Sequence, residues 1–133
     1  MIEINLAKIK SFQDRDTIGR LNHHIAINGL GSFYSKNQFC IATGASQMAV
    51  TLMLQAASIA GAVKMGIAAY DVRDLAVPFF IGMDYPELPT VNPNTDEVIG
   101  SIEGIAVEHV WFFTDIAKKQ GVGFVCNDCG ISD

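Results

Sequence analysis

The fold class is decided by residues 39–70, which read FCIATGASQMAVTLMLQAASIAGAVKMGIAAY. Residues 39–42 form a short apolar run typical of a β-strand, and the following Thr43-Gly44-Ala45-Ser46 is a turn whose hydroxyls can cap a helix. Apolar residues then recur at helical spacing over residues 48–60, and residues 63–70 return to a strand pattern. This order predicts a strand–helix–strand crossover with parallel strands, the basic unit of an α/β fold.

The flanking segments add more strands and a second helix. Residues 96–120 place apolar side chains at helical spacing and end in Lys118 and Lys119, which suit the C-terminal end of a helix. The further strands are expected at residues 2–12, 23–30, 77–83 and 121–126. The prediction is an α/β fold: a mixed β-sheet with a βαβ crossover unit, two long apolar helices and an N-terminal β-hairpin-like extension.

Composition indicates a single α/β domain over residues 1–133. Half of the residues are apolar and 17% are charged, which is enough to bury a core. The net charge is −5, and the densest basic spot is Lys118-Lys119, so we expect neither nucleic acid nor an anionic membrane as a partner. The N-terminus lacks a signal-peptide pattern, which favours a cytoplasmic protein.

The apolar stretch at residues 45–69 has two interpretations. Polar residues interrupt it and Lys64 lies within it, so it predicts a buried helix and not a membrane span. A helix this apolar must be covered on more than one face, which favours a homo-oligomer. The alternative is that the helix is simply central in a small domain.

Three cysteines in a chain without a signal peptide favour reduced thiols over a disulfide framework. Cys126 and Cys129 form a CxxC pair at the end of the last expected strand, which can act as a catalytic thiol pair or hold half of a zinc site. A redox CxxC usually begins a helix, and only four residues follow Cys129, which counts against a thioredoxin-like mechanism. The alternative is two ordinary reduced cysteines.

A zinc site is one hypothesis for the histidines. His109 lies on the apolar side of the second expected helix, and with Cys126, Cys129 and either His23 or His24 it would supply four ligands. The alternative is that His109 is a hydrogen-bonded core histidine.

Two further groups of residues are candidate sites. Thr43, Gly44 and Ser46 would open the apolar helix, where free backbone N–H groups and hydroxyls can bind a small anionic ligand; the alternative is a plain helix cap. Carboxylates near expected strand ends could bind a cation or act as acid and base, or form a solvated loop. These carboxylates are Asp71, Asp74, Asp84 and Glu87.

Two parts of the chain resemble DsrE-like sulfur-relay proteins. One is the series of strand residues 39–42, Thr43-Gly44, helix residues 48–60, Gly61-Ala62 and strand residues 63–68; the other is the closing helix, Gly-Val turn, strand and cysteine at residues 115–126. The first 36 residues have no counterpart. The resemblance implies persulfide transfer with Cys126 as the carrier and Cys129 nearby, assembly into trimers or hexamers, and a sulfur-relay partner protein.

Three functions therefore remain open. The chain is a persulfide carrier using Cys126 and Cys129, a small-molecule enzyme or binding protein with an anion site at Thr43, Gly44 and Ser46, or a zinc-stabilised interaction module.

Overall fold

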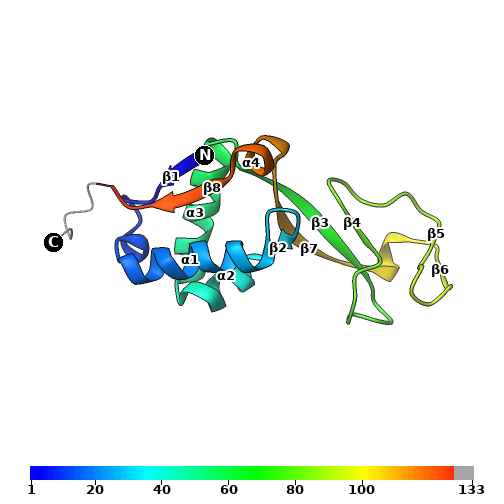
Figure 1. The fold of residues 1–133 in the computed structure, drawn as a ribbon. Helices are drawn as coiled ribbons and strands as arrows, with labels where there is room; N and C mark the ends of the chain where they lie inside the picture. The colour runs from blue at the N-terminus through cyan, green and yellow to red at the C-terminus, as the bar shows by residue number, and fades with distance from the viewer. Residues whose placement is uncertain (128–133) are drawn as a thin grey trace. The chain divides into compact units, whose positions relative to one another are not determined.

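The computed structural model describes residues 1–127. It has an α/β fold in which helices combine with both parallel and antiparallel strand pairs (Figure 1). The chain divides into two compact units: unit 1 is Met1–Lys64 with Trp111–Asp133, and unit 2 is Met65–Val110. Folding as one domain over residues 1–133 stays a prediction.

Unit 1 is built mainly from helices that local caps define. α1 (Arg15–Asn28) begins where the Asp14 carboxylate accepts a hydrogen bond from the Asp16 N–H, 3.0 Å away. α1 packs against α2 (Lys36–Thr43), and α2 packs against α3 (Gln47–Ile59). The shorter helices are the 3₁₀ turn η1 (Lys10–Phe12) and α4 (Asp115–Gln120). Their inward faces form one apolar core, whose largest fully buried side chains include Tyr34, Phe12, Phe39, Leu21, Met53 and Leu54.

Two strand pairs complete unit 1. β1 (Ile2–Asn5) and β8 (Val122–Val125) lie side by side in parallel, with Ile2 opposite Val122 (Figure 1). β2 (Phe33–Tyr34) pairs antiparallel with Trp111 and Phe112, at the end of β7 (Ile105–Phe113). The first and last strands of the described chain are thus neighbours, so the fold brings residues near 5 and near 127 together.

Unit 2 is built mainly from antiparallel strands. β3 (Val63–Asp71), which begins in unit 1, is flanked by β7 and by β4 (Phe80–Gly82), and Ala68 lies opposite Ile81 in β4. β5 (Thr90–Val91) and β6 (Val98–Ile99) form a separate hairpin, and the 3₁₀ turn η2 (Ile102–Gly104) precedes β7. Its core is small, because few apolar side chains are fully buried there.

Several expected elements are confirmed. The apolar helix at residues 48–60 is α3, capped by Ser46, and the strand at residues 63–70 is β3. The strands expected at residues 2–12, 77–83 and 121–126 are present in shorter form as β1, β4 and β8.

Four expectations were wrong. Residues 23–30 fall mostly in α1 and residues 39–42 fall in α2, so residues 39–70 contain no βαβ crossover. Residues 96–120 form β6, η2, β7 and α4 in place of a long helix; the β-branched and aromatic residues of IAVEHVWFF favour the strand. β1 pairs in parallel with β8 and forms no N-terminal hairpin-like extension.

Across residues 1–127, no single helix has the length and apolar composition needed to cross a membrane. Only α2 and α3 taken together meet those two criteria, and they are bent by 113° relative to one another.

The outer edge of β8 is closed by a side chain of α1. The Asn22 Nδ2 donates to the Phe124 carbonyl at 2.9 Å, and the Phe124 N–H donates to the Asn22 Oδ1 at 3.0 Å. One side-chain amide thus replaces the two backbone bonds of a neighbouring strand. Unpaired N–H and C=O groups on a strand edge are a template for pairing with another chain, so this contact also protects the edge.

We expect Asn22→Ala to lower the free energy of unfolding by about 1–3 kcal/mol, because it leaves two partly buried backbone groups without partners. Denaturant unfolding of the whole chain measures the change. Asn28→Ala is the matched control, since the side chain of the exposed Asn28 bonds to His24 of its own helix. Equal losses in the two variants would contradict a special role for Asn22.

Candidate functional site

The region from Ser35 to α3 is shaped by strong local capping signals. The Ser35 Oγ accepts from the Gln38 N–H at 3.1 Å, and the Gln38 Oε1 accepts from the Ser35 N–H at 2.8 Å, which is a complete capping box. α2 ends at Gly44, whose φ of 76° lies in the left-handed region that glycine adopts without strain. The Ser46 Oγ then accepts from the Ala49 N–H at 3.1 Å and starts α3.

These caps produce a helix-turn-helix. The turn between α2 and α3 has three residues, Gly44, Ala45 and Ser46, and the two helices are bent by 113°. Two helices at about 90–120° joined by a short turn containing glycine define this motif. In proteins that use it for binding, the second helix presents its outer face to the partner. The outer face of α3 is therefore the first place to look for a site.

The predicted anion site at Thr43, Gly44 and Ser46 is the turn of this motif. The Thr43 side chain is buried; its Oγ1 donates to the Phe39 carbonyl at 2.6 Å and accepts from the Ala45 N–H at 3.1 Å. The Thr43 carbonyl accepts from Arg20 at 3.1 Å. The turn follows a helix and not a strand, and its hydroxyls are used for capping. Anion binding there stays a prediction.

α3 has two apolar faces. The first packs into the core of unit 1 and consists of Ala49, Val50, Met53, Leu54 and Ala57. The second, which we call the outer stripe, consists of Met48, Leu52, Gln55 and Ile59. The exposed fraction is 68% for Met48, 41% for Leu52 and 89% for Ile59. Residues at spacings of four, three and four positions form a continuous line along one side of a helix, and three of these four residues are apolar.

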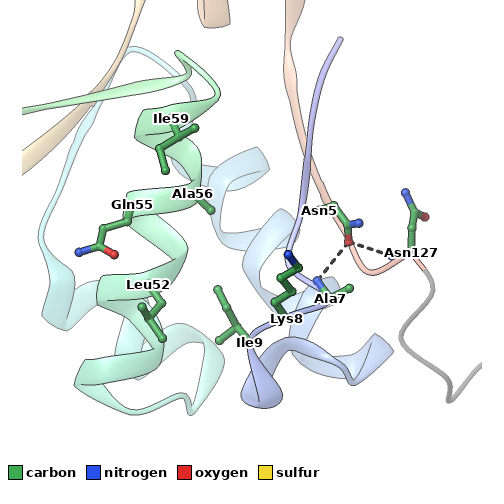
Figure 2. Close-up of a pocket in the computed structure, with 9 residues that line it drawn as sticks. All are labelled: Asn5, Ala7, Lys8, Ile9, Leu52, Gln55, Ala56, Ile59 and Asn127. Carbon is green, nitrogen blue, oxygen red and sulfur yellow. Dashed lines mark hydrogen bonds between the residues drawn. The ribbon is translucent and has the colours of Figure 1, made fainter.

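The outer stripe borders a groove. Figure 2 shows the α3 residues Leu52, Gln55 and Ile59 on one wall, with Ile9 opposite and pointing toward Leu52. The cavity has a volume of about 700 Å³. Its complete lining is Asn5, Ala7, Lys8, Ile9, Leu52, Gln55, Ala56, Ile59 and Asn127, of which only Lys8 is charged. Five of the nine lining residues are apolar, and the amides of Asn5 and Asn127 lie together at one end of the groove.

Asn5 holds that end of the groove in place. Its Oδ1 accepts from the Ala7 N–H at 3.1 Å and from the Asn127 N–H at 3.0 Å, as the dashed lines in Figure 2 mark. Because β1 and β8 are parallel neighbours, the segments that leave them run together, and Asn5 ties one to the other.

The structure describes only one of the two cysteines in the predicted persulfide carrier. Cys126 directly follows β8 and is half-buried, next to Asn127 of the groove. Cys129 lies outside the described residues. A persulfide carried by Cys126 with Cys129 nearby therefore stays a prediction.

The predicted zinc ligand His109 is not on a helix. It is exposed in β7, in unit 2, whereas Cys126 belongs to unit 1. Within residues 1–127, no three His, Cys, Asp or Glu side chains converge to hold a metal ion. A zinc site that includes Cys129 lies outside this statement and stays a prediction.

The semi-buried histidine is His24 and not His109. Its ring lies edge-on to Tyr34 and Phe39, with centroid separations of 5.6 and 5.8 Å. Its Nε2 is buried and has no hydrogen-bond partner among the described residues, and burial lowers the pKa of the imidazole. These contacts make His24 a packing residue of α1 and not a candidate metal ligand.

Of the four carboxylates proposed from the sequence, Asp71 has a structural role. The side chain of Asp71 is buried and accepts from Arg73 Nε and Nη2, both at 2.9 Å, and from Asn92 Nδ2 at 3.3 Å. Arg73 also pairs with Glu97 at 2.6 Å, and its guanidinium holds the pKa of Asp71 well below its usual range. Asp71 therefore fixes the β5–β6 hairpin to the end of β3.

Comparison with known proteins adds no relative: no protein-family model, curated protein or solved structure matches this chain. The candidate site therefore depends on its own geometry.

Proposed function

We propose that the chain is a protein-interaction module that associates with a second copy of itself through the outer stripe of α3. The observation that carries the proposal is an uncharged, largely apolar line of side chains, exposed along a helix whose opposite face is already buried in the core. A helix that is apolar on both sides needs a partner on its exposed side.

The spacing of the outer stripe supports a second copy as that partner. In an antiparallel pairing about a two-fold axis, Met48 lies opposite Ile59 of the second copy, and Leu52 lies opposite Gln55. Such an interface is isologous, because each contact occurs twice with the roles exchanged. α3 contains no charged residue, so pairing it with its own copy brings no like charges together.

The groove provides room for the side chains of the second copy. Leu52 and Ile59 lie on its wall, so an α3 helix laid along the outer stripe would direct its own leucine and isoleucine into it. Lys8 can lay its aliphatic stem along the channel while its ammonium group stays in water.

DNA is a less suitable partner for this helix-turn-helix. In DNA-binding versions the second helix enters the major groove, and nearby Lys and Arg contact the phosphates. α3 has no Lys or Arg over residues 47–59, and three residues of its exposed face are large and apolar.

The decisive experiment introduces a carboxylate into the outer stripe. We expect wild-type protein to sediment at twice the mass of one chain, and Leu52→Glu or Ile59→Glu to sediment as monomer. Each substitution enters an isologous interface twice, so the dissociation constant should rise at least about a hundredfold, with about 1.4 kcal/mol for each tenfold. Analytical ultracentrifugation over a range of protein concentrations measures it.

Ile27→Glu is the matched control, because Ile27 is an exposed isoleucine on α1, outside the stripe. It should leave the mass unchanged. A wild-type monomer at every concentration, or a dimer that survives both stripe substitutions, would refute the proposal. Tight binding of a DNA duplex that Leu52→Glu abolishes would replace it with DNA recognition.

A further inference from the structure

Unit 2 has a strongly uneven charge. Residues 65–110 contain eight Asp or Glu and one Lys or Arg. That cation, Arg73, is bound by Asp71 at 2.9 Å and by Glu97 at 2.6 Å. Six carboxylates are then left with no cation in unit 2: Asp74, Asp84, Glu87, Asp96, Glu103 and Glu108.

Unit 2 also exposes apolar side chains that it does not cover itself. Its exposed large apolar residues include Met65, Val72, Leu75, Val77, Ile81, Met83, Tyr85, Val91, Val98, Ile102 and Val107. Single exposed apolar residues are normal, but eleven of them in a unit of 46 residues leave much apolar surface that a partner could contact. A partner that suits both the apolar side chains and the negative charge of unit 2 would itself be partly apolar and basic.

A hollow on β3 and β7 shows where the two properties meet. It is lined by Tyr70, Leu75, Ala106, Val107 and Glu108 and has a volume of about 340 Å³. Leu75 is 61% exposed, so its side chain is available to a ligand. The Tyr70 hydroxyl donates to the Glu108 Oε1 at 3.4 Å, a long and weak bond that leaves the carboxylate able to accept from a better donor.

We propose that this hollow receives an arginine side chain from a basic, partly apolar segment of a partner protein. The aliphatic stem would lie on Leu75 and Ala106, which shares a face of β7 with Glu108, as arginine stems do on apolar surfaces. The guanidinium would face the Tyr70 ring and form a charge-assisted hydrogen bond to Glu108. The remaining carboxylates of unit 2 attract such a segment and repel nucleic acid and anionic membranes.

The proposal is independent of self-association through α3, since it uses residues of unit 2 only. The probe is a short fluorescently labelled peptide of alternating Arg and Leu, titrated with the full chain and followed by fluorescence anisotropy. We expect saturable binding that weakens as salt is added. A peptide with Glu in place of each Arg should not bind.

Three variants locate the site. Glu108→Gln and Leu75→Ser should each weaken binding about tenfold, corresponding to the loss of a charged or an apolar contact. Glu87→Gln removes the same kind of charge outside the hollow and should change the affinity less than about twofold, the size of a screened surface charge. Equal loss in Glu87→Gln and Glu108→Gln, or full affinity in Leu75→Ser, would overturn the proposal; a thermal melt of each variant checks that it is folded.

Discussion

Leu54→Ala should lower the free energy of unfolding by about 2–5 kcal/mol, whereas Leu52→Ala, two positions away, should change it by less than about 1 kcal/mol in the monomer. The reason is that the two leucines lie on opposite faces of α3. Leu54 is 1% exposed within the core of unit 1, and Leu52 is 41% exposed on the outer stripe. Removing a buried leucine leaves a cavity, while removing an exposed one mainly changes contact with water.

Denaturant unfolding at low protein concentration measures both changes, because dilution separates the stability of the subunit from that of the dimer. Leu52→Ala should instead weaken self-association. The same chemical change thus tests the two faces of one helix, one for its packing in the core and the other for the proposed self-association. Comparable destabilisation by both variants would mean that the outer stripe is covered within the chain.

α3 and β3 could be predicted because their signals are local and strong. Ser46 caps the helix, and apolar residues at helical spacing continue to Ile59. The high apolar content of α3 favoured a homo-oligomer on sequence grounds. The self-association proposal depends on the same feature, since apolar residues of the outer stripe are exposed. The turn at Thr43, Gly44 and Ser46 was selected as a candidate site, although its hydroxyls proved to cap helices.

α2 was missed because a run of four apolar residues fits a strand as well as a helix. The residues that favour a helix over a strand precede residues 39–42. Ser35 and Gln38 are spaced as a capping box, and their reciprocal hydrogen bonds start the helix. Without α2 the helix-turn-helix could not be recognised.

Residues 96–120 were predicted to be one helix because apolar residues such as Val98, Ile102 and Ile105 are three or four positions apart. Neighbouring strands decide the outcome: β2 pairs with one end of β7 and β3 lies beside it, which a one-dimensional pattern does not contain. The parallel pairing of β1 with β8 joins residues about 120 positions apart and is equally invisible to local spacing.

Asp71→Asn should destabilise unit 2 more than any other single loss of charge in that unit. The buried Asp71 carboxylate accepts from the Arg73 N–H and guanidinium and from Asn92, and the amide replacement cannot pair with a guanidinium in two places. Asn92 is also buried, and its N–H and carbonyl hold the β5–β6 loop. Hydrogen exchange of the Arg73 and Asn92 amides measures the loss, and we expect both to exchange markedly faster. Asp84→Asn, at an exposed aspartate that accepts from the Tyr85 N–H, is the control and should leave them unchanged.

Asp71→Asn should also change how the stability of unit 2 depends on pH. The pKa of Asp71 is depressed in the folded state, so its contribution to stability is fully present above the ordinary aspartate pKa of about 4 and is lost as the pH falls below that value toward the folded pKa. In that window the unfolded chain binds a proton that the folded chain does not. Wild-type protection of the Arg73 and Asn92 amides should therefore fall between about pH 5 and pH 2, whereas Asp71→Asn should be poorly protected throughout and show a flatter profile. Parallel profiles for wild type and Asp71→Asn would mean that other carboxylates, and not this buried one, govern the acid stability of unit 2.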